Sequence, residues 1–271
     1  MRRVALAVLA LSLAPRAASA DWPEARPSAA RDLLAGFRWG DLPAWIAPSP
    51  VRPLAALEAL EAAGPGDAPR WAERAVLLRL VARVEDAAAA LEHARAGGAL
   101  EDPDALLTAA WIDARRSQFE RAVALAMQAL PRLPRSPWSA ALTLTVARWS
   151  LARGPEGLAS ARALLDALRV VGPLPPRATA LLAMVFARGG DEAGARAIVR
   201  EMGLSLSPSL AEPLGADRQD PAFAEQINAA GVALLLAGRG AEAAPLLRRA
   251  EAQTPPGWRD FQRRMSLRAG P

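Results

Sequence analysis

The feature that most constrains the fold is a pattern of small residues that recurs along most of the chain. Its clearest copy is the stretch "GVALLLAGRGAEAAPLLRRAEAQTPP", which runs from Gly231 to Pro256. When this stretch is aligned with other parts of the sequence, one alanine recurs among similarly spaced small and apolar residues. It occurs at five positions, namely Ala87, Ala122, Ala161, Ala195 and Ala243. The intervals between these alanines, in chain order, are 35, 39, 34 and 48. A period near 34 with occasional insertions predicts stacked copies of one supersecondary unit.

Each copy has the pattern of two helices that pack closely in antiparallel orientation. In the last copy, the first helix is predicted to place small and apolar residues on one face, at Ile227, Ala230, Gly231 and Leu234. The second helix places Ala243, Leu247 and Ala250 on one face. Small residues at the contact let two backbones approach, and the leucines fill the space between contacts. Helix starts are predicted where an N-cap residue precedes proline, at 102–103, 136–137 and 220–221.

Five such copies in succession resemble the tetratricopeptide repeat (TPR) family. Four of them close with a proline at the twelfth or thirteenth position after the aligned alanine. The resemblance implies an all-α fold, a right-handed superhelical solenoid of antiparallel helix pairs, with repeats at 68–101, 103–137, 138–175, 176–208 and 224–256. Residues 21–67 are expected to form an N-terminal arm and a degenerate helix pair (28–37 and 53–64), with an extended Pro-rich segment at 41–53. The amphipathic stretch within 257–271 is expected to cap the other end, with Trp258, Phe261 and Met265 on its apolar stripe.

The composition agrees with an all-α fold and does not favour nucleic-acid binding. Hydrophobic residues make up 52% of the chain and aromatic residues only 5%, so the apolar content is mostly Ala and Leu, which favour helices. All 33 basic residues are arginine, which is typical of a GC-rich genome. Beyond position 20 there remain 30 arginines against 28 acidic residues, and no basic block is interleaved with aromatic residues as phosphate binding requires.

The N-terminal segment 1–20 has the pattern of an export signal. Arg2 and Arg3 precede an apolar stretch at 4–14, and Ala18 and Ala20 occupy the small positions that a signal peptidase recognises. The apolar stretch is too short to span a bilayer, which takes about 20 residues. We therefore expect cleavage after Ala20, a mature chain that begins at Asp21, no transmembrane segment, and a periplasmic location.

The sequence offers little for catalysis, metal binding or a cofactor. His93 is the only histidine and lies in a helical pattern, and the chain has no Cys and no Lys. These absences disfavour Ser–His–Asp, Ser–Lys and cysteine chemistry, phosphate-binding loops with lysine, and thiolate metal sites. Acidic pairs such as Glu85–Asp86 and Glu101–Asp102 lie beside predicted turns, where carboxylates usually cap helices. We expect no enzymatic activity and no cofactor or metal.

In the TPR family the first helices of the repeats line a concave groove. The resemblance places seven residues of this chain at such inward positions: Arg79, Trp111, Arg115, Arg148, Met184, Arg188 and Asn228. Trp111, Arg148 and Met184 occupy equivalent positions of successive repeats and are expected to form a ladder. Arg, Trp and Met are enriched at protein interfaces, so these residues are candidates to bind a peptide or a helix. Alternatively, Trp111 fills space between repeats and the arginines only reflect coding bias.

A second candidate surface lies near the N-terminus. Its aromatic residues are Trp22, Phe37, Trp39 and Trp45. They are expected to fold back onto the first repeat, and a partner-docking strip is the alternative. The sequence as a whole predicts an exported scaffold that binds a protein or peptide in the cell envelope. The alternatives are a structural subunit of a secretion, pilus or envelope-assembly machine and, with less support, an accessory or enzyme acting on cell-wall glycan.

Overall fold

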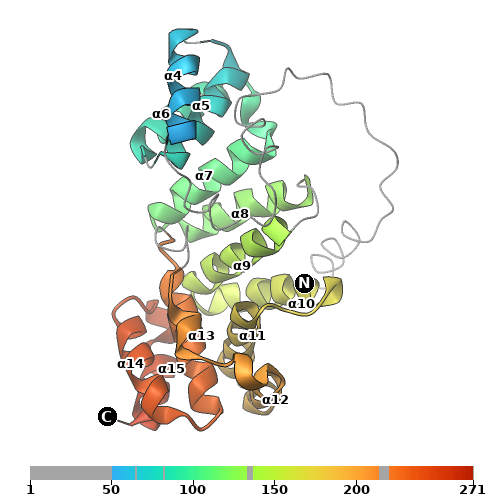
Figure 1. Cartoon of the computed structure of the whole chain (residues 1–271), viewed down its shortest axis with the longest axis vertical. Coiled ribbons are helices and arrows are strands. Elements are labelled where there is room, and N and C mark those ends of the chain that lie inside the picture. The colour runs from blue at the N-terminus through green and yellow to red at the C-terminus, as the bar shows by residue number, and fades with distance from the viewer. Residues whose placement is uncertain (1–50, 65, 82, 133–136, 214–219, 271) are drawn as a thin grey trace. The chain divides into compact units, whose positions relative to one another are not determined.

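The computed structural model describes residues 51–64, 66–81, 83–132, 137–213 and 220–270. Its regular structure is entirely helical, with twelve α-helices and no strand among these residues (Figure 1). The all-α prediction is thereby confirmed. None of the helices in the described ranges combines the length and the hydrophobicity that a membrane span requires.

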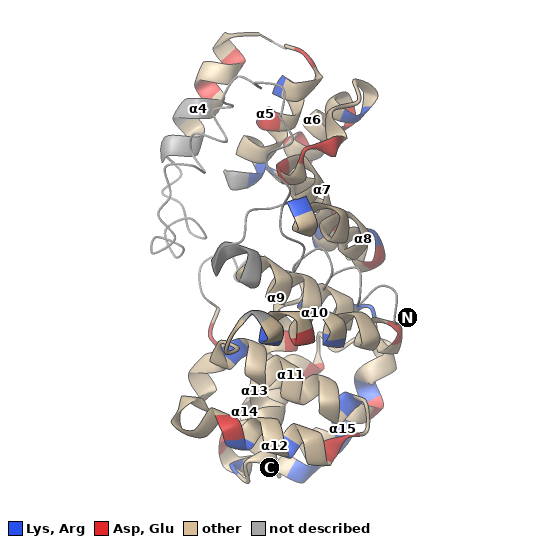
Figure 2. Cartoon of the chain, turned by 90° about the vertical axis from the view of Figure 1, so that its right-hand side faces the viewer, with Lys and Arg blue, Asp and Glu red and all other residues tan. Residues whose placement is uncertain are grey.

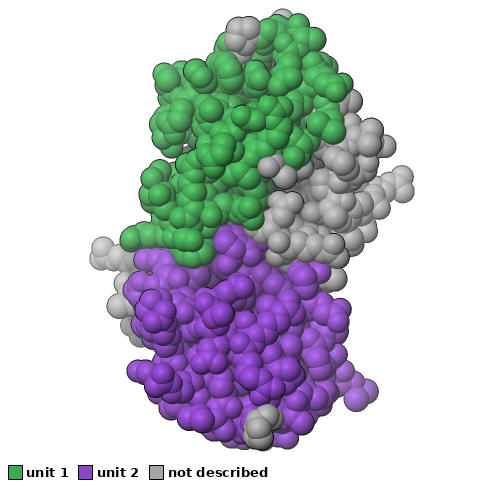
Figure 3. Space-filling view, turned by 90° about the vertical axis from the view of Figure 1, so that its left-hand side faces the viewer, with its two compact units in different colours: residues 1–139 green, residues 140–271 purple. Residues whose placement is uncertain are grey.

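The chain divides into two compact units, Met1–Ser139 and Ala140–Pro271 (Figure 3). The described helices of unit 1 are α4 (Val51–Ala62), α5 (Ala68–Leu80), α6 (Val84–Ala96), α7 (Pro103–Arg115) and α8 (Phe119–Ala129), with short 3₁₀ turns at Ala99–Glu101 and Leu130–Arg132. Helix α5 packs against α6, and α7 packs against α8. Their apolar side chains form one core that includes Leu77, Leu91 and Ile112.

Unit 2 holds the remaining helices. These are α9 (Pro137–Ala152, which begins just before the unit boundary), α10 (Leu158–Val171), α11 (Pro176–Arg188), α12 (Glu192–Met202), α13 (Phe223–Leu236), α14 (Gly240–Glu251) and α15 (Arg259–Ala269). Short 3₁₀ turns lie at η4 (Pro155–Gly157), η5 (Gly203–Ser205), η6 (Pro208–Ala211) and η8 (Pro256–Trp258). Helix α11 packs against α12, α13 packs against α14, and α15 packs against α14.

The aligned alanines occupy one structural position in five different helices. Ala87, Ala122, Ala161, Ala195 and Ala243 lie in α6, α8, α10, α12 and α14, and each is 0% exposed. In α6, α8, α12 and α14, the alanine N–H donates a hydrogen bond to the carbonyl at the start of the helix, over 2.9 to 3.1 Å. A side chain larger than a methyl group has no solvent to enter at these positions, which explains why the sequence repeats alanine there.

The turn between the two helices also recurs in three of the hairpins. Ser117, Gly190 and Gly238 each stand five positions before an aligned alanine and have positive φ angles of 59°, 84° and 79°. The next residue donates its N–H back across the turn, from Gln118 to Asp113 over 2.8 Å, and likewise from Asp191 to Phe186 and from Arg239 to Leu234. This bond closes the end of the first helix in the manner of a Schellman motif. Ser117 therefore holds a left-handed conformation that glycine adopts with less strain.

The close helix contacts predicted for the last repeat are present. A Cβ atom added to Gly231 of α13 would lie 2.9 Å from two side-chain carbons of Leu247 in α14. Leu247 is itself 0% exposed, so it has little room to move away. Gly231 thus lets α13 and α14 approach each other, which a larger residue would prevent.

The predicted helix starts have mixed outcomes. Asp102 caps α7 as expected, because its Oδ1 accepts hydrogen bonds from the N–H groups of Asp104 and Ala105 at 2.8 and 3.3 Å, with Pro103 in the first helical position. Helix α9 begins at Pro137, whereas Ser136 lies outside the described residues. The start predicted at 220–221 is wrong: α13 begins at Phe223, and the Asp220 side chain binds the N–H of Ala222 and partners elsewhere in unit 2.

The two flanks were predicted with unequal success. Helix α4 begins at Val51, so the end of the segment 41–53 is helical rather than extended, while 28–37 lies outside the described residues.

At the C-terminal end, α15 and its preceding turn bury Trp258, Phe261 and Met265, each at 5–6% exposure. Arg268 of α15 forms a bidentate ion pair with Glu192 of α12, at 2.9 and 3.1 Å. Hydrogen bonds from Arg268 and Arg196 lower the pKa of Glu192 to about 2.

Candidate interaction surface

The seven residues predicted to line a groove are divided between the two units. Arg79, Trp111 and Arg115 belong to unit 1, and Arg148, Met184, Arg188 and Asn228 belong to unit 2. Of the predicted ladder, Trp111 belongs to unit 1, and Arg148 and Met184 belong to unit 2.

The unit 1 residues keep partial access to solvent. The Trp111 side chain is half-buried and packs against the core of unit 1, so it is in part the filler that the alternative interpretation expected. Arg115 is exposed, and its guanidinium carbon lies 5.6 Å from the centre of the Trp111 ring. Such a cation–π contact holds an apolar ring and a set of hydrogen-bond donors next to each other on the surface. Arg79 is half-buried, and burial lowers the pKa of its guanidinium while Asp104 raises it.

Two of the unit 2 residues belong to the core. Met184 of α11 is 0% exposed, and Asn228 of α13 is 1% exposed. The reason is that α11 packs against both α12 and α13, so its predicted groove face is covered by other helices of the same unit. Neither side chain is open to a partner in this structure, which corrects the expectation that Met184 supplies an apolar contact.

Arg148 of α9 is also buried, and its acidic partner comes from the same chain. Its Nη2 atom lies 2.8 Å from Oδ2 of Asp220, and the two side chains are 2% and 5% exposed. The indole N–H of Trp149 donates to the other carboxylate oxygen of Asp220 over 3.0 Å. The ring of Phe223 lies 5.6 Å from the Arg148 guanidinium carbon. An arginine expected to hold an acidic partner thus holds a carboxylate at the end of the insertion 203–221.

Arg188 of α11 is buried in a similar arrangement. Its Nη1 atom lies 2.6 Å from Oε2 of Glu225 in α13, with both side chains almost fully buried. The guanidinium also lies over the rings of Trp258 and Phe261, 4.7 and 5.7 Å from their centres. Burial lowers the pKa of Arg188, and the charge of Glu225 opposes that shift. Arg188 is therefore enclosed by α13, by the turn before α15 and by α15 itself.

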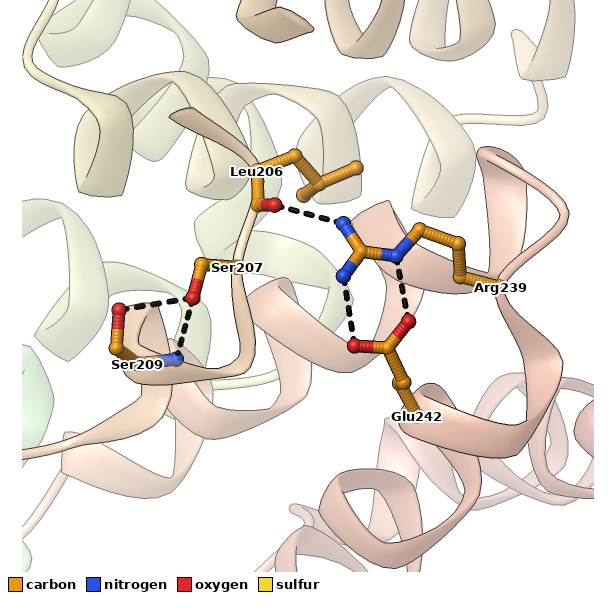
Figure 4. A network of polar contacts seen from close by, with 5 residues as sticks. All are labelled: Leu206, Ser207, Ser209, Arg239 and Glu242. Carbon is orange, nitrogen blue, oxygen red and sulfur yellow. Dashed lines mark hydrogen bonds and ion pairs between the residues drawn. The ribbon is translucent and has the colours of Figure 1, made fainter. Parts of the chain in front are cut away.

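The insertion 203–221 contributes to this enclosure. Its Leu206, Leu210 and Ala211 are buried, and the turn η6 packs against α13 and α14. Arg239, between α13 and α14, donates a hydrogen bond to the carbonyl of Leu206 over 2.7 Å and two hydrogen bonds to Glu242 over 2.6 Å (Figure 4). Arg177 of α11 donates to the carbonyl of Glu212. These contacts fasten the insertion to the helices of unit 2.

The residues that sequence reasoning missed are the acidic partners, Asp220 and Glu225. The Asp-Pro pair at 220–221 indicates a helix cap in the sequence and gives no sign of a buried ion pair. Glu225 and Gln226 are 3% and 0% exposed and stand at the start of a helix that is otherwise almost entirely apolar. Charged residues in an apolar helix are a signal of buried pairing, because an unpaired buried charge is strongly unfavourable.

His93, the only histidine of the chain, lies exposed on α6. Its ring stacks on Trp71 of α5, with centroids 4.4 Å apart and planes 25° apart, and Arg74 lies 5.1 Å from the same indole. Within the described ranges, no group of three or more His, Cys, Asp or Glu side chains is placed to hold a metal ion. The N-terminal aromatic residues Trp22, Phe37, Trp39 and Trp45 lie outside the described residues.

Unit 2 also has a surface cavity of about 420 Å³ at the ends of α10 and α12. Its floor includes Leu182, Ile198 and Met202, and Arg169 and Glu201 face each other at its edge over 3.6 Å. This cavity is the size of a small-molecule or side-chain pocket.

Comparison with protein-family models, with curated proteins and with solved structures finds no match to this chain.

Proposed function

We propose that the protein is an exported scaffold of the TPR type that mediates protein–protein contacts in the cell envelope. The observation that supports it best is the repetition of one hairpin: the five aligned alanines are all fully buried in second helices, and the same turn recurs in three of the hairpins. Repeated helix pairs stack into solenoids whose first helices line an extended binding face. In this proposal the helix pairs of the chain form a right-handed superhelical solenoid.

Unit 1 supplies the docking face in this proposal. Trp111 and Arg115 lie one helical turn apart on α7, with the exposed guanidinium beside the half-buried indole. A partner segment packs an apolar side chain against Trp111, and Arg115 binds a carboxylate or a backbone carbonyl of that segment. Arg148 and Arg188 of unit 2 are buried, so they do not take part.

Export is the second element of the proposal. Residues 1–20 act as the signal, and the mature chain begins at Asp21. N-terminal sequencing of the protein isolated from its native host tests this directly. Recovery of a chain that still carries Met1 would contradict export.

A second candidate function is that of a permanent structural subunit in a secretion, pilus or envelope-assembly machine. The filled interior of unit 2 favours this alternative to a transient peptide receptor, because only the outward surfaces of that unit remain for contacts. Both candidates bind protein, and they differ in the lifetime of the complex and in the surface used.

Photo-crosslinking from α7 tests protein binding at the proposed face. A photoreactive amino acid replaces Arg115 in one variant and Arg95, which is exposed on α6, in a control variant. We expect a discrete protein adduct in the envelope fraction of the native host from position 115 and a much weaker one from position 95. Equal labelling from both positions, or no adduct from position 115, would rule out docking on this face.

A further inference from the structure

The arginines of the last two helices differ from most others in the described part of the chain. Elsewhere, ion pairs join many arginines to carboxylates, as in Arg116–Glu85 at 2.6 Å and Arg95–Glu92 at 2.8 Å. Five exposed arginines near the C-terminus have no ion pair or hydrogen bond from their side chains within the described residues: Arg248 and Arg249 on α14, and Arg259, Arg263 and Arg264 on α15. Coding bias explains why these residues are arginine rather than lysine, but it does not explain why five of them follow one another in the last two helices without side-chain partners.

The exposed side of α15 places an apolar residue among these charges. Leu267 is 76% exposed, one of the most exposed large apolar residues in the described chain. Arg263 and Arg264 precede it by four and three positions, so all three share one helix face. This face is opposite the stripe that α15 buries with Phe261 and Met265. Figure 2 marks the arginines of α14 and α15 in blue.

Few carboxylates oppose these charges locally. Between positions 248 and 267 the only acidic residues are Glu251 and Asp260, against five arginines. Arg268, the next arginine, is already bound to Glu192 and is not part of the set. Arg259 and Arg263 stand four positions apart on one face of α15, where like charges repel, and an anionic partner relieves that repulsion.

We propose that the arginine face of α15, which consists of Arg259, Arg263, Arg264 and Leu267, docks an acidic segment of a protein partner. The inference rests on the proposed function in that the partner is a protein, and it adds a second docking surface with a stated chemistry. The guanidinium groups form charge-assisted, bidentate hydrogen bonds with glutamate or aspartate side chains. Leu267 packs against an apolar side chain of the same segment.

The structure favours a protein partner over a lipid surface. Helices that lie in a membrane interface expose a broad apolar face with Trp, Phe or Leu. Helix α15 and its preceding turn instead direct Trp258, Phe261 and Met265 inward, which leaves Leu267 as the large apolar residue on the exposed side. Single-stranded nucleic acid needs exposed aromatic rings for stacking, and the aromatic rings of α15 and its preceding turn are buried.

A charge-reversal pair with a matched control tests the proposal. The test variant is R263E/R264E. The control is R70E/R200E, which changes two exposed arginines on α5 and α12 that also have no side-chain partner within the described residues, and which alters the net charge equally. Both full-length variants are first checked for an unchanged melting temperature. Binding is then measured by fluorescence anisotropy with a fluorescein-labelled peptide of repeated Glu-Glu-Leu-Glu units.

We expect R263E/R264E to weaken binding of this peptide by more than about tenfold at low salt and R70E/R200E by less than about twofold. L267A is expected to weaken binding several-fold at constant salt, which a purely electrostatic attraction would not produce. Equal binding by the two charge-reversal variants would overturn the proposal. Binding to phosphatidylglycerol vesicles or duplex DNA without binding to the peptide would also overturn it and would point to a membrane or a nucleic acid.

The outcome of this binding experiment can be distinguished from the outcome of the crosslinking test of the proposed function. If the adduct from position 115 forms and its protein partner is captured equally by wild type and R263E/R264E, the arginine face is not a docking site although the protein is still a scaffold. If no protein adduct forms from position 115 while the peptide binds R263E/R264E more weakly than the control variant, docking on α7 is refuted and docking on the arginine face is supported.

Discussion

The two units use the same hairpin but treat the exposed side of their first helices differently. In unit 1, α7 keeps Arg115 exposed and Trp111 half-buried. In unit 2, α9 and α11 direct Arg148 and Arg188 toward the carboxylates of Asp220 and Glu225, and both arginines are buried. The difference arises from the extra chain in unit 2, because the insertion 203–221 and α15 have no described counterpart in unit 1. Equivalent positions in a repeat therefore share backbone geometry without sharing access to solvent.

Charge reversal at one first-helix arginine of each unit should give the largest difference between the units. Arg148→Glu would bury a carboxylate against Asp220, so we expect a loss of about 4 kcal/mol or more in the free energy of unfolding. Arg115→Glu changes an exposed side chain and should alter it by less than about 0.5 kcal/mol. Urea denaturation followed by circular dichroism measures both. Similar stabilities for the two variants would mean that Arg148 is not enclosed by unit 2.

The buried pair of Arg188 and Glu225 gives the next largest effect. Arg188→Met leaves a buried carboxylate unpaired and should destabilise the protein by about 3–5 kcal/mol, as should Glu225→Leu. The double variant removes both charges and should recover most of that loss, because Met and Leu can pack against Trp258 and Phe261. A double-mutant cycle measured by urea denaturation gives the coupling free energy between the two side chains. Additive losses would show that the two side chains do not interact.

Overpacking of the shared hairpin should affect both units alike. Ala122→Leu in α8 and Ala243→Leu in α14 each insert a large side chain at a position that is 0% exposed. We expect each to lower the free energy of unfolding by about 1–3 kcal/mol. Arg264→Ala, on the exposed side of α15, is the control and should change it by less than about 0.5 kcal/mol. An effect in only one unit would indicate that the aligned alanines are not equivalent.

The smallest effect is expected at the turn of unit 1. Ser117 has a φ of 59°, where the equivalent residues of unit 2, Gly190 and Gly238, are glycine. Ser117→Gly should stabilise the protein by about 0.5–1 kcal/mol by removing left-handed strain. Gly190→Ser should destabilise it by a similar amount. If Ser117→Gly is destabilising, the serine side chain makes a favourable contact that outweighs the strain.

The repeated elements were the predictable part of this molecule. The aligned alanines identified the second helices because a position with no free volume admits only a small residue, and that restriction is visible in the sequence. The contacts that fill unit 2 were not predictable in the same way. Arg148 and Asp220 lie far apart in the sequence, and nothing local to either residue specifies the other.

The residues predicted to line a groove also show that long-range contacts are not predictable from the local sequence. Position within a repeat indicates which side of a helix a residue occupies, and that side was expected to be open at Met184 and Asn228. Whether it is open depends on what the rest of the chain packs against it: α12 and α13 pack against the helix of Met184, and α11, α14 and η6 pack against the helix of Asn228. Glu225, the one charged residue inside α13, was the available sign, because an acidic side chain in an apolar helix needs a buried cation.

Thiol labelling tests most directly whether the first-helix face is open in unit 1 and filled in unit 2. The chain has no cysteine, so single-cysteine variants report one site each. The variants are Arg115→Cys in α7 and Met184→Cys in α11, and the reaction with a maleimide is followed in native buffer and in urea. We predict that position 115 reacts in native buffer nearly as fast as in urea, whereas position 184 reacts only at the rate of unfolding. Rapid native labelling at position 184 would contradict the account, because it would show that the face of unit 2 is open.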